Sequence, residues 1–300
     1  MKLIKLFLII SLSIFLIGNL AGCDRADDSN IEVRGSDTMV NLGQSLAEAY
    51  MGINDEVSIS VTGGGSGTGI SALIDGRVDI VNSSRAMKEE EIEQANDNNI
   101  EPFEVVIAMD GLAVFVNENI PVEELTVDEI GAIFRGDLTN WSELGGPDQT
   151  ISMYGRQSNS GTYVYFRENV LKADFSDNVK RMNGTSQIIE GVSSDAHAIG
   201  YGGIGYTVDD GEVVAGLTVL NIAVDEDSEA ASPLIPENVE TGKYPIARPL
   251  YNYTDGKPEG NIRKYIEFIL NEKGQETAVN TGFYPVSPEF HEYNEQQLTD

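Results

Sequence analysis

The 300-residue sequence is poor in the side chains that hold most structural metal ions, with one cysteine and two histidines. Cys23 has no second cysteine to pair with, so we expect no disulfide. His197 and His291 are far apart in the chain, and with a single cysteine they give no spacing typical of a zinc site. The many acidic residues do not follow the twelve-residue calcium-loop pattern. We therefore expect neither a metal ion nor a cofactor.

Basic residues are also scarce. The chain has 19 Lys and Arg against 49 Asp and Glu, a formal net charge of −30 at pH 7. Nucleic-acid binding needs clustered Lys and Arg, so it is not expected. The acidic surface fits an ordinary solvated face or a saline habitat, and the sequence leaves both open. Any anion site in this chain must act through local geometry against the field of the whole protein.

Signatures of common enzymes are missing. The glycine-rich Gly63–Gly69 has no lysine after its last glycine, so it is not a nucleotide P-loop. Ser66 is not in a Gly-x-Ser-x-Gly elbow, because position 68 is threonine. A hydrolase would have to use His197 or His291 as its base. We expect no catalytic activity, with an extracytoplasmic hydrolase as the weaker alternative.

The only segment that reads as a targeting signal is at the N-terminus. Lys2 and Lys5 precede an apolar run from Leu6 to Ile17, which is too short for a typical membrane span. Leu20-Ala21-Gly22-Cys23 resembles a bacterial lipobox. We predict a signal peptide over 1–22, a lipidated Cys23 and a polar tether over 23–30, which anchor the exported chain to the outer face of the cell membrane. The alternative is an ordinary signal peptide with an unpaired cysteine.

The rest of the chain alternates short strands with helices, which predicts an α/β fold. Its length suits two domains or two lobes. Met109-Asp110-Gly111 separates two apolar strand-like runs, and we interpret it as a crossing between lobes. The prediction is a first lobe over 31–109, a second lobe over 110–221, and a return to the first lobe over 222–300, including the C-terminal helix.

Polar turns that each open a helix carry the candidate chemistry. They are Gly35–Thr38, Gly63–Gly69 and Arg156–Thr162, and each is predicted between a strand and a helix. A fourth segment, Asn82–Arg85, follows a strand at the end where open α/β sheets usually bind ligands. Each segment alone is typical of an ordinary helix cap or polar loop. Together they favour a binding site.

The physical reason is that the first turn of a helix has backbone N–H groups without intrahelical partners, at the positive end of its dipole. An anion satisfies both. Glycine allows the backbone to approach closely, and hydroxyl groups add donors. Arg156 adds a planar fork that matches two oxygens of an oxyanion. Several such turns would form a donor-rich cage that needs little net positive charge.

With these motifs in this order, the chain resembles the phosphate-binding subunits of Pst-type phosphate ABC transporters from about Ile31 to Pro285. The segments that carry the resemblance are Gly35-Ser36-Asp37-Thr38, Gly65-Ser66-Gly67, Asp79–Arg85, Asp110-Gly111, Arg156 with Ser160-Gly161-Thr162, and Ala198-Ile199-Gly200-Tyr201.

The resemblance implies a two-lobed fold of the periplasmic-binding-protein type II class, with two hinge strands and the ligand in the cleft between the lobes. It also implies a monomer that captures inorganic phosphate and hands it to the membrane permease of an ABC transporter. The residues that match the family's ligand loops, together with the neighbouring Asp37, are Ser36, Asp37, Thr38, Ser66, Ser84 and Arg85 in the first lobe, and Arg156, Ser160, Gly161 and Thr162 in the second.

The chain departs from some relatives at two positions, because they carry aspartate where Ser84 and Ser158 stand here. A carboxylate acceptor can recognise the proton on hydrogen phosphate and reject fully ionised sulfate. Asp37 is the one motif carboxylate available for that role, unless it only caps its own helix. Another tetrahedral oxyanion such as sulfate therefore stays open as the ligand, as does a sensor or scavenger without a transporter.

Overall fold

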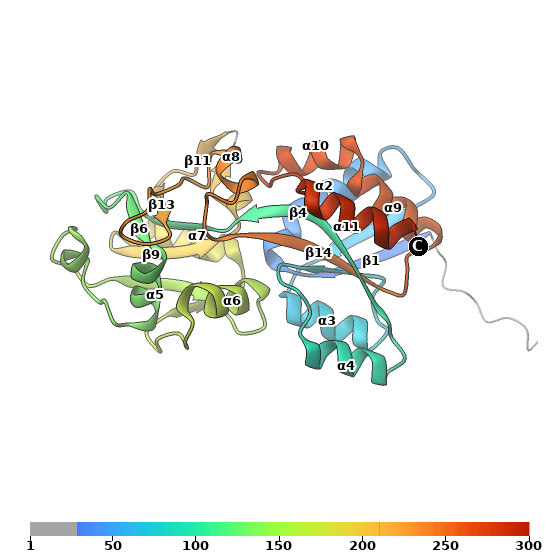
Figure 1. The fold of residues 1–300 in the computed structure, drawn as a ribbon, viewed down its shortest axis with the longest axis horizontal. Coiled ribbons are helices and arrows are strands. Elements are labelled where there is room, and N and C mark those ends of the chain that lie inside the picture. Colours follow the sequence, from blue (N-terminus) through green and yellow to red (C-terminus); the bar gives the residue numbers. More distant parts are fainter. Residues whose placement is uncertain (1–28, 210, 300) are drawn as a thin grey trace, which may run out of the picture.

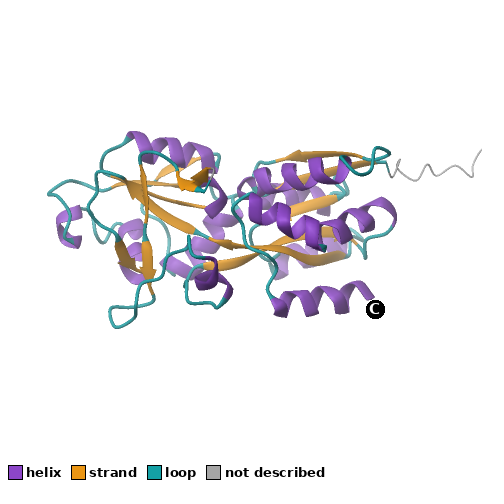
Figure 2. Ribbon diagram, turned by 90° about the horizontal axis from the view of Figure 1, so that it is seen from above, coloured by secondary structure: helices purple, strands orange, loops and turns teal. Residues whose placement is uncertain are grey.

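The computed structural model describes residues 29–209 and 211–299, which form two α/β lobes side by side (Figures 1 and 2). The first lobe is built on a five-stranded sheet in the order β2-β1-β3-β14-β4. Its strands are β1 (Asn30–Gly35), β2 (Ser58–Thr62), β3 (Ile80–Ser83), β4 (Pro102–Gly111) and β14 (Ala247–Asp255). Its helices are α2 (Val40–Met51), α3 (Ser66–Ile74), α4 (Glu89–Asp97), α9 (Gly260–Leu270), α10 (Glu272–Asn280) and α11 (Pro288–Thr299).

The second lobe has its own five-stranded sheet, in the order β12-β5-β9-β7-β8. Its strands are β5 (Ala113–Asn117), β7 (Ser152–Arg156), β8 (Lys180–Met182), β9 (Ala198–Gly202) and β12 (Leu217–Val219). The main helices are α5 (Val127–Arg135), α6 (Gly161–Phe166), α7 (Thr185–Ser194) and α8 (Pro236–Glu240). Two small strand pairs complete it: β6 (Glu124–Thr126) with β13 (Asn221–Ala223), and β10 (Val208–Asp209) with β11 (Glu212–Val213).

Two long strands, β4 and β14, run between the lobes (Figure 1). They pair antiparallel over their whole length, with Ala247 opposite Gly111 at one end and Asp255 opposite Pro102 at the other. β4 ends at Gly111, and β5 begins at Ala113 in the other sheet. This strand pair is therefore the covalent connection around which the lobes can move.

The return crossing lies later in the chain than the sequence indicated. We expected it at residue 222, but β13 pairs with β6 inside the second lobe, and the strand that re-enters the first sheet is β14. The error has a physical reason. Short strands alternate apolar and polar residues whichever sheet they join, so the pattern shows that a strand exists without showing its partner.

Buried apolar side chains explain why the sheets form where they do. The interior strand β5 is buried along its whole length, which fits its continuous apolar run Ala113–Val116. In the same lobe an aromatic cluster packs between β9 and α6, where the ring of Phe166 stacks on that of Tyr201 with centroids 3.9 Å apart. Buried aromatic pairs of this kind stabilise a lobe, and the Tyr201 hydroxyl also accepts the Arg156 N–H at 3.3 Å, which ties the cluster to the end of β7.

The predicted signal peptide and the lipidated Cys23 lie outside the described residues. Across the stretches 29–209 and 211–299, none of the helices combines the length and apolar character that a bilayer span requires.

Candidate functional site

The polar turns singled out in the sequence meet where the two lobes face each other, at the ends of β1, β3 and β7. At the end of β1, Gly35 has a φ of +145°, and a Cβ there would lie 2.1 Å from the backbone oxygen of Asn82. Glycine is therefore required for β1 and β3 to end side by side. The next residue, Ser36, donates its N–H to the same Asn82 oxygen at 2.7 Å. This contact sets the two loops of the first lobe against each other.

Five hydroxyl side chains from both lobes lie in mutual contact, and we call them the hydroxyl cluster: Ser36, Thr38, Ser66, Ser84 and Thr162. All are buried. Ser36 Oγ donates to Ser84 Oγ at 3.0 Å, and Thr38 Oγ1 is 2.7 Å from Thr162 Oγ1 of the other lobe. Ser66 Oγ lies 3.3 Å from Ser84 Oγ and accepts the Ser84 N–H at 3.1 Å.

The first turn of α6 lies directly against this cluster. A Cβ at Gly161 would be 2.3 Å from Ser66 Oγ and 2.7 Å from Ser84 Oγ, so a glycine is needed for the helix to approach. Ser160 is the N-cap of α6, and its Oγ accepts the N–H of Tyr163 at 3.4 Å. The positive end of a helix dipole therefore faces the hydroxyl groups of the first lobe.

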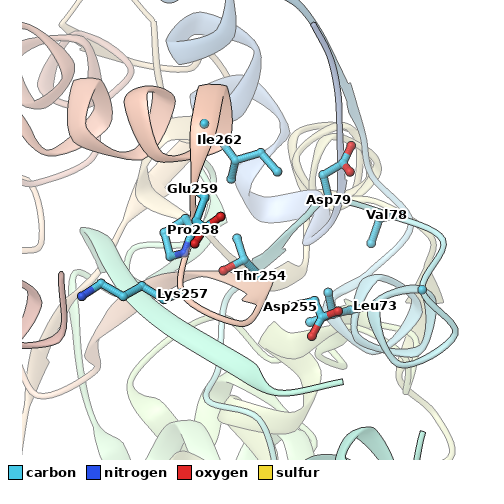
Figure 3. A pocket seen from close by; sticks show the side chains of 11 residues that line it. Leu73, Val78, Asp79, Thr254, Asp255, Lys257, Pro258, Glu259 and Ile262 are labelled. Carbon is cyan, nitrogen blue, oxygen red and sulfur yellow. The ribbon is translucent and has the colours of Figure 1, made fainter. Parts of the chain in front are cut away.

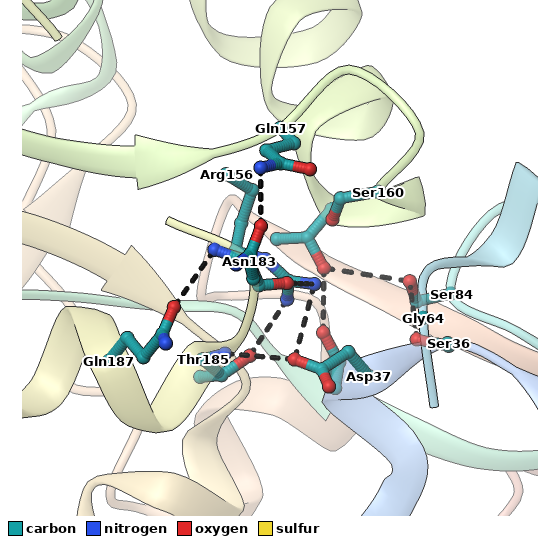
Figure 4. A network of polar contacts seen from close by, with 12 residues as sticks. Ser36, Asp37, Gly64, Ser84, Arg156, Gln157, Ser160, Asn183, Thr185 and Gln187 are labelled. Atoms are coloured by element: carbon teal, nitrogen blue, oxygen red, sulfur yellow. Dashed lines mark hydrogen bonds and ion pairs between the residues drawn. The ribbon is translucent and has the colours of Figure 1, made fainter. Parts of the chain in front are cut away.

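Arg156 is buried at the end of β7, beside the cluster (Figure 4). It donates to Thr185 Oγ1 at 2.9 Å and to the carbonyl of Asn183 at 3.0 Å, and its Nη2 lies 3.2 Å from Asp37 Oδ2. Burial lowers the pKa of Arg156, and the neighbouring Asp37 carboxylate opposes that shift. Among the described residues, the buried Arg156 Nε has no hydrogen-bond partner. A buried, unpaired donor is costly unless a ligand satisfies it.

Asp37 makes its bonds across the lobes rather than to its own helix. Besides the ion pair with Arg156, its Oδ2 accepts the Thr185 N–H at 2.9 Å, and its backbone oxygen accepts a hydrogen bond from Tyr206 at 2.8 Å. Within the described chain no hydrogen bond joins the Asp37 carboxylate to the hydroxyl cluster. The structure therefore gives Asp37 an interlobe contact.

Arg85 is the sequence-predicted site residue that the structure does not bring to the cluster. Its two terminal nitrogens donate to Glu91 of α4 at 2.7 and 2.6 Å, and one of them also to the carbonyl of Ala86 at 2.8 Å. Burial of Glu91 acts to raise its pKa, but hydrogen bonds from Arg85 and from the Lys88 N–H outweigh it and lower the pKa. The physical reason for the correction is this bidentate pair inside the first lobe.

Two further charged residues at the site are Arg248, which the motifs in the sequence do not include, and Asp110, which the sequence shows only as part of a motif. Both are buried completely, and they lie opposite each other on β14 and β4. Arg248 Nε and Nη2 donate to Asp110 Oδ2 at 3.1 and 2.8 Å. Arg248 also donates to Thr162 Oγ1 at 2.9 Å and to the backbone oxygen of Ser84 at 3.0 Å. The sequence offered one signal, an aspartate that directly follows the apolar run Val105–Met109.

Direct contacts between the lobes show that the structure is a closed arrangement. The N–H of Gly67 donates to the backbone oxygen of Asn159 at 3.0 Å, and Asn159 Nδ2 donates to the backbone oxygen of Gly64 at 2.9 Å. These bonds join the glycine-rich turn of the first lobe to the loop before α6. They lie at one edge of the boundary between the two lobes. We call this boundary the seam, and it contains the hydroxyl cluster.

A pocket in the first lobe, away from this seam, offers a different chemistry (Figure 3). Its lining includes Asp79, Asp255 and Glu259 with a single basic residue, Lys257. The Asp79 and Asp255 carboxylates accept backbone N–H groups of Glu32 and Glu101, so they brace neighbouring segments. An acidic lining repels anions. This pocket therefore does not suit an anion, unlike the donor-rich hydroxyl cluster between the lobes.

Two α/β lobes joined by a pair of strands, with a buried polar cluster at their seam, define a ligand-binding protein of the two-lobed periplasmic-binding class. The family model described as PBP superfamily domain matches residues 24–273. "Phosphate-binding protein PstS" of Pseudomonas aeruginosa is 32% identical over 275 residues, covering 86% of this chain and 83% of the relative. The chain therefore belongs to the PBP superfamily, in the family of PstS phosphate-binding proteins.

Further relatives agree with this membership. The PstS protein of Bacillus subtilis is 31% identical over 279 residues, covering 89% of this chain and 83% of the relative. A crystal structure from Clostridium perfringens, assigned to a phosphate ABC transporter and solved with bound phosphate, is 31% identical. It superposes with a TM-score of 0.76 and covers 86% of this chain and all of its own. An ABC-type phosphate transport receptor from Vibrio cholerae is 27% identical with a TM-score of 0.67, covering 85% of this chain. The type II two-lobed fold expected from the sequence is thus confirmed.

Proposed function

We propose that this protein captures inorganic phosphate between its two lobes and delivers it to the permease of an ABC transporter. The observation that carries the proposal is the buried seam, where hydroxyl groups from both lobes surround the end of β7 and Arg156 holds an unpaired buried donor. The named function of the PstS relatives supports the same ligand. A tetrahedral oxyanion is the kind of ligand that satisfies converging donors from several directions.

The proposed ligand set follows from these contacts. Arg85 is left out of it because both of its terminal nitrogens donate to Glu91 inside the first lobe, although its Nε, like that of Arg156, has no partner among the described residues. Hydroxyl donors come from both lobes, the first turn of α6 adds backbone N–H groups, and Arg156 adds a charged donor. The residues are Ser36, Thr38, Ser66, Ser84, Arg156, Ser160, Gly161 and Thr162, with Asp37 as the partner of Arg156.

The site is built almost without net charge. Arg156 is paired with Asp37, and Arg248 with Asp110. Aligned N–H and O–H dipoles in a buried, low-dielectric setting replace net positive charge as the source of stabilisation for an anion. This arrangement suits a protein whose formal charge is −30, because it needs no cationic surface.

Binding is proposed to act through lobe closure and without catalysis. An anion held by donors from both lobes favours the closed arrangement over any open one, and the permease then recognises the closed molecule. The hydroxyl groups of the cluster neighbour other hydroxyls, Arg248 and a backbone N–H. That environment supplies donors but no general base to activate a nucleophile.

We further propose that the chain is exported and anchored to the outer face of the membrane through a lipid on Cys23. The lipobox-like sequence before Cys23 supports this, together with the absence of any other cysteine. Mass spectrometry of the membrane-extracted protein should find Cys23 as a lipid-modified N-terminus. Recovery of a chain that retains residues 1–22 would contradict the anchor.

Sulfate, or another tetrahedral oxyanion, is the alternative ligand. It is favoured by one observation: Asp37 Oδ2 is bonded to Arg156 and Thr185, and no hydrogen bond among the described residues joins the carboxylate to the hydroxyl cluster, so its placement does not single it out as the acceptor of a phosphate proton. Calorimetric titration of the purified protein, stripped of bound ligand, with phosphate and then sulfate distinguishes the two. Tight phosphate binding with weak sulfate binding supports the proposal, and preferential sulfate binding refutes it.

A sensor or scavenger would bind phosphate without a transporter. Cross-linking in membranes that contain the protein should capture permease subunits in the presence of phosphate. If phosphate binds tightly but no permease is captured, the capture role stands and the delivery role is refuted.

A further inference from the structure

Arg248 and Asp110 form a buried ion pair on the two strands that connect the lobes, and we call them the hinge pair. We propose that the hinge pair is a positioning element for the ligand site: it fixes the Thr162 hydroxyl as a hydrogen-bond donor and stabilises the closed lobes. This inference rests on the proposed phosphate-binding function and names residues that act on the site through others.

The contacts of the hinge pair reach both lobes at once. On the first lobe, Arg248 Nη1 donates to the backbone oxygen of Ser84 at 3.0 Å. On the second lobe, Arg248 Nη2 donates to Thr162 Oγ1 at 2.9 Å, and Asp110 Oδ1 accepts the N–H of Ile204 at 3.1 Å. Since both strands belong to the sheet of the first lobe, the bonds to Thr162 and Ile204 are the part of the hinge pair's interactions that depends on how the lobes meet.

The direction of the bond to Thr162 is fixed, because a guanidinium group can only donate. Thr162 Oγ1 must therefore accept from Arg248, and its own hydrogen is left to point elsewhere in the cluster. The same logic applies to Ser66, whose Oγ accepts the Ser84 N–H, and to Ser160, whose Oγ accepts the Tyr163 N–H. Each of these three hydroxyl groups thus keeps its own proton to donate, either to a neighbouring hydroxyl of the cluster or to an anion.

The hinge pair fixes the direction of the hydrogen bond to Thr162, but it adds no net charge to the site. Asp110 takes two of the Arg248 hydrogen bonds, and both side chains are almost fully shielded from water, at 1% and 0% exposure. The charge available to attract the anion therefore comes from elsewhere in the site. Replacing Arg248 should change how well the donors are aimed and how long the lobes stay closed.

The helix that carries Thr162 is tied to the same strand by a second contact. Tyr165 of α6 donates its hydroxyl to the backbone oxygen of Ala247 at 3.0 Å, and its ring lies 5.1 Å from the Arg248 guanidinium carbon. α6 is thus held against β14 at Ala247 and at Arg248. A shift of α6 away from β14 would therefore break the bond between Arg248 and Thr162 and separate the two lobes at the same time.

The test is the double variant Arg248→Met/Asp110→Leu, which removes both charges together. Replacing both partners of a buried ion pair with apolar residues of similar volume is often neutral for stability, whereas removing one leaves an unpaired charge. The control is Lys180→Met/Asp195→Leu, an ion pair confined to the second lobe. Phosphate affinity is measured by calorimetry, rate constants by stopped flow, and the melting temperature by calorimetric scanning.

We expect the hinge-pair variant to melt close to the unaltered protein and to bind phosphate about tenfold to a hundredfold more weakly, mainly through faster dissociation. The control should keep its dissociation constant within about threefold. Unchanged phosphate affinity in the folded hinge-pair variant, or an equal loss in the control, overturns the proposal.

If the double variant does not fold, the single variant Arg248→Lys tests the positioning role of Arg248. Lysine keeps the charge beside Asp110, but it cannot hold Asp110, Ser84 and Thr162 with one planar fork. We expect about tenfold weaker phosphate binding with little change in melting temperature. Wild-type affinity in Arg248→Lys refutes the positioning role. A failure of the proposed phosphate-binding function can be told apart from a failure of the positioning role, because in that case the unaltered protein would not bind phosphate either.

Discussion

Ion pairs that span the seam and ion pairs inside one lobe make an instructive comparison. Arg156–Asp37 joins the second lobe to the first, and Arg248–Asp110 lies on the connecting strands with bonds to both. Arg85–Glu91 lies inside the first lobe, and Lys180–Asp195 inside the second. A pair inside one lobe persists whether the lobes are open or closed, so it contributes to folding. A pair whose contacts span the seam contributes to the equilibrium between open and closed states.

The largest effect is expected for Arg156→Ala. It removes the charged donor of the site, and a hydrogen bond to a charged group is worth roughly 1.5–3 kcal/mol, or about tenfold to more than a hundredfold in affinity. Calorimetric titration with phosphate measures the loss. Arg167→Ala, on the more exposed continuation of α6, is the control. Unchanged phosphate affinity in Arg156→Ala would contradict the site assignment.

Asp37→Asn separates two roles of that carboxylate. If Asp37 only holds Arg156 and the Thr185 N–H, phosphate and sulfate affinities should change in parallel, by about tenfold or less, since the amide oxygen still accepts one bond. We expect this parallel change. A selective loss of phosphate binding, with sulfate unaffected, would show that Asp37 recognises the ligand proton.

Salt should accelerate binding, because the arginines at the seam are neutralised by their partners while the whole chain carries −30. Screening by added salt weakens the repulsion between the protein and a phosphate dianion. Stopped-flow association rates should rise by about threefold to tenfold between roughly 20 mM and 500 mM sodium chloride. Slower association at high salt would mean that an unpaired positive patch steers the anion.

The smallest effect on binding is expected for the pair inside the second lobe. Burial acts to raise the pKa of Asp195, but hydrogen bonds led by that from Lys180 lower it from 3.8 to about 2. A depressed carboxyl pKa stabilises the fold above the unfolded value, and this contribution is lost as the pH falls from about 4 toward 2. Asp195→Asn should therefore flatten the acid dependence of the melting temperature over that range.

At neutral pH, Asp195→Asn should leave the phosphate dissociation constant within about twofold of the unaltered protein. A large loss of phosphate affinity in this variant would break the distinction between pairs inside a lobe and pairs that span the seam.

The sequence predicted the loops of the site better than the side chains between them. Glycines and hydroxyl residues next to strand ends are local signals, and Ser66, Gly161 and Thr162 do lie at the seam. Arg248 could not be found in this way, because its pairing with Asp110 depends on strand register across 138 positions. The pairing of Arg85 with Glu91 could not be predicted either, because a local motif does not show which way a long side chain turns.

The measurement that tests the central claim most directly is small-angle X-ray scattering of the ligand-stripped protein titrated with phosphate. The account predicts that the radius of gyration falls on adding phosphate, with a midpoint that matches the calorimetric dissociation constant, because donors from both lobes converge on one ion. A radius that stays constant while calorimetry reports binding would contradict closure of the lobes around the ligand.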